Sequence, residues 1–233
     1  MSLGKRFKSA QEKINAEKRY TVPEAVALVI ETATAKFDEA VDVAINLGID
    51  AKQSDQQVRG AIPLPHGLGK PVRVVVFAKG EKENEAKAAG ADHVGADDLV
   101  QKINGGWLDF DKVIATPDMM GTVSKVAKIL GPRGLMPNPK VGTVTFEVGK
   151  AVSAEKKGKL DFRVDKNGII HASVGRKSMG AEKIADNLNA LLGAVVKAKP
   201  ATSKGIYLGN IVLSSTMGPG VKIDSNRVAA SIS

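Results

Sequence analysis

The sequence predicts an antiparallel α+β domain that is interrupted by an inserted α/β domain with a parallel, Rossmann-like sheet. Two observations support this fold class. Residues 41–47, 160–174 and 206–213 alternate between apolar and polar side chains, as strands do when one face of their sheet is buried. Between the first two of these segments, short apolar runs take turns with helical segments, which is typical of a parallel sheet that is covered on both faces.

A run rich in Gly and Pro, Pro63–Pro71, marks the first border of the insert, because such runs form linkers. The insert should leave a discontinuous domain made from both ends of the chain. The expected borders are residues 1–67 and 159–233 for the discontinuous domain, 68–158 for the insert, and 65–71 and 157–160 for the hinge.

Composition restricts the partners that the protein can have. The net charge of +9 and the pI of about 9.6 favour a polyanion, first nucleic acid and second an anionic membrane. Aromatic residues make up only 4%, which argues against a protein that stacks single-stranded bases on aromatic platforms. The sequence has no cysteine, no 18-residue apolar run and no apolar leader, so we expect a cytoplasmic protein that does not enter a membrane.

The first 64 residues predict a basic segment, a helix and two strands. Residues 4–19 are rich in Lys and Arg and form either a basic helix or arm, or a solvated helix face. Thr21-Val22-Pro23-Glu24 is typical of a capping box that begins a helix, which should run to about Ala35. Strands follow at 41–47 and Arg59–Leu64.

The insert predicts three strands, each followed by a helix. These elements are, in chain order, Val72–Phe77, Glu81–Gly90, Ala91–Val94, Asp97–Asn104, Lys112–Thr116 and Met119–Leu130. Lys79-Gly80-Glu81-Lys82 stands where a dinucleotide fold needs G-x-G-x-x-G, and Pro71 replaces the hydroxyl that a phosphate loop needs after Gly69-Lys70. A nucleotide-binding α/β enzyme is therefore the disfavoured alternative.

The loop Ile129–Thr143 follows the last of these helices. It holds three Gly and three Pro, so it is neither a helix nor a central strand. Arg133 and Lys140 make it basic. Two interpretations remain open: a long connection with solvated charges, or a loop that binds an anion or an RNA backbone.

The rest of the chain returns to one-face alternation. The predicted elements are, in order, strands at 144–148, 160–164 and 169–174, a helix at Ala181–Lys197 and a strand at Gly205–Ser214. Asn167-Gly168 predicts a hairpin turn between the second and third of these strands. The run Ser214–Gly220 combines hydroxyls, backbone amides and Gly. It is either an ordinary turn or a loop that a phosphate or sugar can approach closely.

Nothing in the sequence marks a catalytic or metal-binding set. His66, His93 and His171 do not show the spacing of metal ligands, and no pair of acids is marked by spacing as general acid and base. We therefore expect no catalytic residue, no metal and no cofactor, and a protein that is not an enzyme.

Four motifs together point to a known family. They are Leu64-Pro65-His66-Gly67-Leu68-Gly69-Lys70, Ala115-Thr116-Pro117-Asp118, Gly131-Pro132-Arg133-Gly134-Leu135-Met136-Pro137-Asn138-Pro139-Lys140 and Thr216-Met217-Gly218-Pro219. In this order they closely resemble the family of large-subunit ribosomal protein number one (the bacterial "L-one" family), and the resemblance covers essentially the whole chain.

The resemblance implies a structural ribosomal protein of two domains, monomeric when free. It implies binding to large-subunit rRNA in the mobile stalk, contact with other ribosomal components, and help in releasing deacylated tRNA from the exit site. It also implies repression of translation through binding of the mRNA of its own operon. A dedicated off-ribosome RNA-binding regulator is the alternative, and it would use the same surface.

The resemblance also implies a set of RNA-binding residues. The set is Lys36, Phe37, Thr216, Met217 and Gly218, with Ser214, Asp165 and Lys166 as neighbours, and Arg133 and Lys140 in a secondary RNA-facing loop on the insert. Phe37 and Met217 would give apolar contact to the RNA, while Lys36 and Lys166 would contact phosphates. Such a patch suits the recognition of folded RNA through its shape, sugar hydroxyls and backbone.

Overall fold

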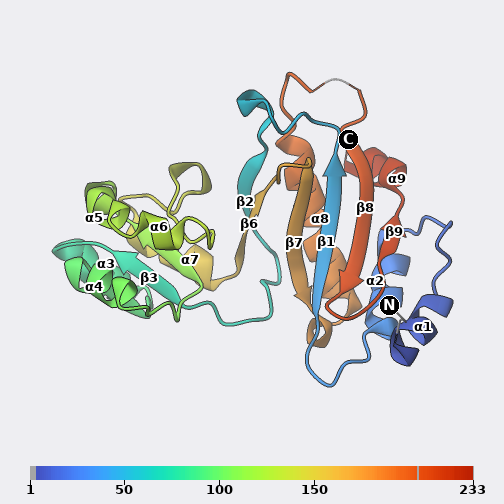
Figure 1. Cartoon of the computed structure of the whole chain (residues 1–233), viewed down its shortest axis with the longest axis horizontal. Coiled ribbons are helices and arrows are strands. Elements are labelled where there is room, and N and C mark those ends of the chain that lie inside the picture. Colours follow the sequence, from blue (N-terminus) through green and yellow to red (C-terminus); the bar gives the residue numbers. More distant parts are fainter. Residues whose placement is uncertain (1–3, 204, 233) are drawn as a thin grey trace. The chain divides into compact units, whose positions relative to one another are not determined.

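The computed structural model describes residues 4–203 and 205–232, which form two compact units (Figure 1). One unit combines the residues up to Gly69 with those from Leu160 onward, and the other is Lys70–Lys159. The first unit holds an antiparallel sheet and the second a parallel sheet. The predicted fold class, an antiparallel α+β domain interrupted by a parallel α/β domain, is confirmed.

The sheet of the discontinuous unit has the strand order β7-β1-β8-β9 (Figure 1). β1 (Ala40–Leu47) lies between β7 (Ile169–Arg176) and β8 (Leu208–Ser215), and β9 (Val221–Ile223) pairs with β8. All three pairings are antiparallel. The central strand therefore joins segments that are far apart in the sequence.

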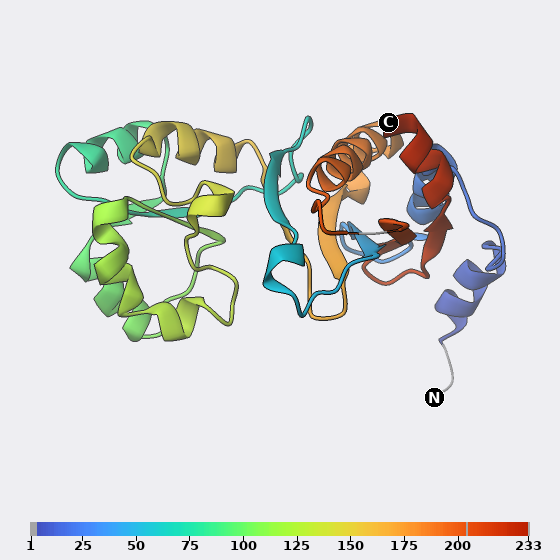
Figure 2. The ribbon, with the colours of Figure 1, turned by 90° about the horizontal axis from the view of Figure 1, so that it is seen from above.

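One face of this sheet forms the core of its unit. It packs on α2 (Val22–Thr32), α8 (Ala181–Lys197) and α9 (Ser225–Ile232), as Figures 1 and 2 show. The buried side chains follow the two-residue spacing of a strand in β1 and the three- to four-residue spacing of a helix in α8. They include Val41, Val43, Ile45 and Leu47 in β1 and Ile184, Leu188, Leu191 and Val195 in α8. The opposite face stays open across β7, β1 and β8 (Figure 1).

The helices before this sheet follow the sequence prediction in part. The basic segment begins with a short helix, α1 (Lys5–Glu12). The predicted capping box opens α2, where Glu24 Oε2 accepts from the backbone N–H and from the hydroxyl of Thr21, both at 2.9 Å. α2 ends at Thr32, three residues before the predicted end.

The predicted turn around Asn167-Gly168 and both of its strands are present, but the strands do not form an extended ladder with each other. β6 (Lys159–Arg163) pairs with β2 (Arg59–Pro63), whereas β7 pairs with β1. Val164, the residue after β6, forms a single antiparallel bridge with Ile170 of β7. The ring of Phe162 lies directly against Gly60, where a Cβ would come within 2.7 Å of it, so this glycine lets the two strands approach.

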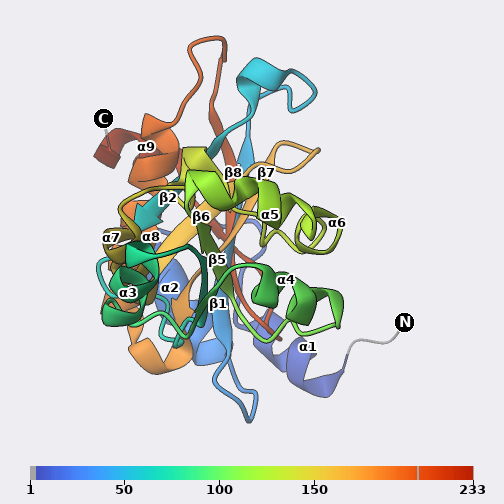
Figure 3. The same ribbon diagram turned by 90° about the vertical axis from the view of Figure 1, so that its left-hand side faces the viewer.

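The insert contains a small sheet that is buried on both faces. β3 (Val74–Phe77) lies between β4 (His93–Gly95) and β5 (Lys112–Ala115), and both pairs are parallel. Figure 3 shows the helices on its two sides. They are α3 (Glu81–Ala88) and α7 (Val148–Lys156) on one side, and α4 (Asp97–Asn104), α5 (Met120–Ser124) and α6 (Ala127–Leu130) on the other.

Two predictions for the insert need correction. The helix predicted at Met119–Leu130 is broken between α5 and α6, where Val126 leaves the helical conformation and is buried. The strand predicted at 144–148 is reduced to one bridge between Val144 and Ala115, and α7 begins at Val148. Val148 and Val152 are one helical turn apart and both are buried, so this helical spacing prevails over the local alternation.

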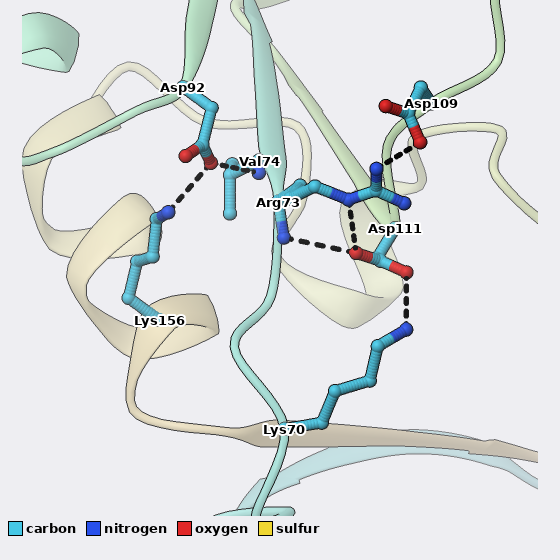
Figure 4. A network of polar contacts seen from close by, with 7 residues as sticks. All are labelled: Lys70, Arg73, Val74, Asp92, Asp109, Asp111 and Lys156. Carbon is cyan, nitrogen blue, oxygen red and sulfur yellow. Dashed lines mark hydrogen bonds and ion pairs between the residues drawn. The ribbon is translucent and has the colours of Figure 1, made fainter.

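Aspartates that stand directly before β4 and β5 accept hydrogen bonds from residues at the start of β3 (Figure 4). Asp111, directly before β5, accepts from Lys70 Nζ at 2.9 Å and from the backbone N–H and Nε of Arg73 at 3.1 and 3.2 Å. Asp109 also pairs with the Arg73 guanidinium. Burial opposes the ionisation of Asp111, but these donors outweigh it and lower its pKa to about 2.

A second carboxylate acts in the same way at the neighbouring strand (Figure 4). Asp92, directly before β4, accepts from the backbone N–H of Val74 at 2.7 Å and from Lys156 Nζ at 2.6 Å. Lys156 is the last residue of α7, so this bond ties the end of that helix to the start of the sheet. Asp111 and Asp92 thus hold the start of β3, and Asp92 also holds the last residue of α7.

We predict that Asp111→Asn destabilises the insert by about 1 to 2 kcal/mol at neutral pH, because a carboxylate with a lowered pKa stabilises the fold when it is ionised. Trp107, the only tryptophan, lies in the insert and packs against His93 and Phe110, so its fluorescence in urea reports this unit. The folded pKa lies below the unfolded value, so the contribution is present above about pH 4 and is lost as the pH falls towards 2.

The matched control is Glu147→Gln, which removes the charge of an exposed ion pair with Lys150 in the same unit. It should change stability by less than about 0.5 kcal/mol. Equal unfolding curves for the Asp111 variant and the wild type, at every pH, would contradict the assigned role of Asp111.

Candidate nucleic-acid interface

Two loops meet at one end of β1. Residues 33–39 lead into β1, and residues 216–220 connect β8 to β9. Because β1 and β8 are antiparallel with Val41 opposite Ser215, the start of one lies beside the end of the other. The structure therefore brings together the segments that hold Lys36, Phe37, Thr216, Met217 and Gly218. We call these five residues the loop patch.

The loop patch exposes two large apolar side chains. Phe37 is 53% exposed and Met217 is 52% exposed. Lys36 is also exposed, next to Phe37. Gly218 follows Met217 in a tight turn, where a Cβ would lie 2.4 Å from the hydroxyl of Ser215. A larger residue here would have to displace this hydroxyl. The arrangement offers apolar surface and positive charge side by side.

The hydroxyl of Thr216 already has partners inside the protein. Its Oγ1 accepts from the backbone N–H of Ala40 at 3.0 Å and donates to the carbonyl of Ala40 at 3.3 Å. The backbone N–H of Thr216 donates to the same carbonyl at 3.0 Å. Thr216 thus joins the turn after β8 to the first residue of β1.

Glu39 lies beneath the loop patch and belongs to none of the motifs that the sequence marks. It is completely buried. Its Oε1 accepts from the N–H of Ala35 at 2.7 Å, and its Oε2 accepts from the N–H of Met217 at 3.0 Å. Burial opposes its ionisation, but these two donors, together with the Ser215 hydroxyl and the charge of Arg6, outweigh burial and lower its pKa. The sequence could have indicated this burial, because position 39 continues the two-residue spacing of the buried residues in β1, which begin at Val41.

A second carboxylate fixes the outer side of the same loop. Asp38 accepts from the hydroxyl of Ser178 at 2.8 Å and from its backbone N–H at 3.0 Å. These two bonds, with Arg176 nearby, lower the pKa of Asp38. The loop that presents Lys36 and Phe37 is therefore attached both to the turn after β8 and to the turn before α8.

Ser214 lies on the open face of the sheet, close to the loop patch. It is paired opposite Asp42 in β1. A shallow depression of about 380 Å³ is lined by these two residues together with His171 and Ser173 of β7. Val43, Ala44 and Ala172 complete the lining, and the depression lies on the open face near the loop patch.

Asp165 and Lys166 lie at the other end of the sheet. β7 begins with Ile169 opposite Asn46 of β1, six residues beyond Ala40, which corresponds to roughly 20 Å along the strand. Asp165 Oδ1 accepts from the N–H groups of Asn167 and Ile169 at 2.8 and 2.9 Å. Lys166 is exposed and helps to line a depression of about 360 Å³, which also includes Arg163. The structure does not place this turn beside the loop patch.

Arg133 and Lys140 belong to the separate unit formed by the insert. Both side chains are exposed on the loop that follows α6. The loop is held at its base, where the N–H of Asn138 donates to Thr143 Oγ1 at 2.7 Å and the N–H of Lys140 donates to Asn138 Oδ1 at 2.8 Å. This is a shaped loop with two exposed cations.

The described residues contain no group of three or more His, Asp and Glu side chains arranged to hold a metal ion. Within the same part of the chain, every helix is too short or too polar to cross a bilayer. His66 pairs with Asp186 at 3.0 Å, and His93 packs edge-on against Trp107 with ring centres 4.7 Å apart.

Comparison with known proteins gives a consistent result. The profile of the ribosomal protein L1p/L10e family matches residues 29–219. The chain is 74% identical over 227 residues to the large ribosomal subunit protein uL1 of Bdellovibrio bacteriovorus, covering 97% of each chain. It is 56% identical over 225 residues to the protein of the same name from Solidesulfovibrio magneticus, covering 97% of this chain and 96% of the relative.

We predict that Thr216→Val loosens the contact between the two loops, because it removes both hydroxyl bonds to Ala40 while keeping the size of the side chain. The free energy of unfolding should fall by about 1 kcal/mol, and the amide of Ala40 should exchange faster with solvent. Thr216→Ser keeps the hydroxyl and should keep the slow exchange. If the valine and serine variants exchange alike, the hydroxyl does not hold the loops together.

Proposed function

The chain belongs to the ribosomal protein L1p/L10e family, and on this basis we propose that it binds large-subunit rRNA in the mobile stalk beside the tRNA exit site. Its relatives are named as proteins of the large ribosomal subunit, so the chain is a ribosomal protein of that subunit and not an enzyme. We further propose that it acts in the cytoplasm, as a part of the ribosome that assists the release of deacylated tRNA.

The observation that carries the proposal is the loop patch. Phe37 and Met217 are exposed next to a lysine, on loops whose backbones are fixed by Asp38, Glu39 and Thr216. A fixed surface of this kind binds folded RNA without first losing conformational entropy. Apolar contacts would give specificity for shape, whereas Lys36 would contact a phosphate.

We propose that the RNA continues along the open face of the sheet. Ser214 lies next to the loop patch, and Asp165 and Lys166 lie roughly 20 Å away at the far end of β1 and β7. Lys166 would contact a second stretch of the phosphate backbone, while Asp165 would keep the turn in shape through its bonds to Asn167 and Ile169. A folded RNA helix is long enough to cover both ends.

The insert has a separate part in this proposal. We propose that the two compact units are the two domains of the family, joined by a hinge near residues 65–71 and 157–160. The exposed cations Arg133 and Lys140 on the shaped loop of the insert would contact RNA as a secondary site, either in the stalk or in the exit-site tRNA.

A regulatory role is the second candidate function. We propose that the free protein, a monomer, represses its own operon by binding a stalk-like site in the mRNA with the loop patch. An RNA-binding regulator that acts only off the ribosome would use the same surface. The two differ in what else the protein binds, because only a ribosomal protein must also contact other ribosomal components.

We predict different salt responses for two substitutions in the loop patch. Lys36→Gln should weaken binding to a stalk rRNA hairpin and reduce the slope of log K against log salt by about 0.7 to 0.9, because one phosphate contact is lost. Phe37→Ala should weaken binding about tenfold and leave the slope unchanged, because the lost contact is apolar. Lys87→Gln, an exposed charge in the insert, is the control for net charge.

These affinities are measured by titration at several salt concentrations, with an unrelated hairpin for comparison. If all three variants bind both hairpins as the wild type does, the loop patch is not the RNA site. If only the slopes change, and by the same amount for Lys36 and Lys87, binding is due to diffuse charge.

We also predict that the stalk rRNA hairpin and the operon mRNA compete for one site, because both would occupy the loop patch. Each RNA should displace the other at a concentration set by its own affinity, and Phe37→Ala should weaken both by a similar factor. A ternary complex of the protein with both RNAs would contradict a shared surface.

A further inference from the structure

We propose that Glu39 is the positioning residue of the RNA-binding surface: its buried carboxylate holds the loop of Lys36 and Phe37 and the turn of Met217 in the arrangement that RNA meets. This inference rests on the proposed function. In this proposal Glu39 does not contact the RNA itself.

The geometry places Glu39 between three segments of the chain. Each carboxylate oxygen accepts from a different loop, Oε1 from the N–H of Ala35 at 2.7 Å and Oε2 from the N–H of Met217 at 3.0 Å. Its own carbonyl accepts from the N–H of Lys177 at 2.9 Å. One residue thus bridges the loop before β1, the turn after β8 and the turn after β7.

An apolar residue at this position could not make the same connections. Position 39 is in phase with the buried residues of β1, so the core alone would favour a side chain such as valine. An apolar side chain would leave the part-buried N–H groups of Ala35 and Met217 without this acceptor, and donors that are shielded from water and lack partners are costly. The glutamate therefore serves the two loops rather than the core.

A carboxylate is also an unexpected group beneath a surface that binds phosphates. Its burial removes it from contact with RNA, and its negative charge is directed at two backbone N–H groups. Arg6 of α1 lies close enough to favour the ionised form as well. The charge thus orders the patch and is shielded from the ligand.

The test is Glu39→Gln, which keeps the size of the side chain but leaves one oxygen to accept from two donors. Affinity for the stalk rRNA hairpin should fall about tenfold, because the two loops lose one of their shared bonds. The salt slope should stay at the wild-type value, because no phosphate contact is removed. Lys36→Gln, measured in parallel, should change the slope.

Glu24→Gln is the matched control. It removes another carboxylate that accepts from a backbone N–H, in the capping box of α2, outside the loop patch. It should lower the thermal stability and leave the RNA affinity unchanged. Comparing Glu39→Gln with Glu24→Gln shows whether affinity is lost because the protein is less stable or because the loops have moved.

Each outcome decides the proposal. If Glu39→Gln binds the stalk hairpin as tightly as the wild type, Glu39 is not a positioning residue, whatever its effect on stability. If the wild type itself does not prefer the stalk hairpin over an unrelated one, the proposed function has failed instead. If the variant does not fold, amide exchange in the wild type decides: slow exchange at both Ala35 and Met217 supports the bridge, and rapid exchange at either overturns it.

Discussion

The antiparallel pairing of β1 with both β7 and β8 is the constraint on which the rest of the structure depends. β7 and β8 follow the 90-residue insert Lys70–Lys159 in the sequence, whereas β1 precedes it. The sheet therefore forms only when segments from both ends of the chain pair. The pairing buries one face on α2, α8 and α9. The register, with Val41 opposite Ser215, also places the loop before β1 beside the turn after β8. Core and candidate site thus follow from one set of backbone bonds.

Carboxylates do much of the positioning in this basic chain. Glu39, Asp38 and Asp165 accept from backbone N–H groups in loops, and Asp92 and Asp111 accept from N–H groups at the edge of the parallel sheet. Such bonds are charge-assisted and stronger than neutral ones. They also direct the negative charges inward or along the backbone. The net charge of +9 therefore remains available to a polyanionic partner, while the acids hold the shape of the loops.

The sequence allowed the fold class to be predicted because local periodicity reports burial. The alternation in β1 and the helical spacing in α8 gave the inward residues correctly. The main partner of a strand is a non-local choice: the turn between residues 160–164 and 169–174 was predicted correctly, but the two strands share only one bridge and pair mainly with β2 and β1. The segments of the loop patch could be named from family motifs, but their connection through Glu39 required the register of β1 against β8. The distance of Lys166 from that patch likewise became clear only from the pairing of β1 with β7.

We propose that the candidate RNA-binding surface is already formed in the free protein. Amide hydrogen exchange of residues 33–39 and 216–218, with and without a stalk rRNA hairpin at high salt, tests it most directly. We expect slow exchange in the free protein and further slowing with the stalk hairpin but not with an unrelated one. Rapid exchange in the free protein would contradict a preformed surface, because the loops would then become ordered only on binding. Protection spread over all Lys-rich and Arg-rich segments would contradict it as well.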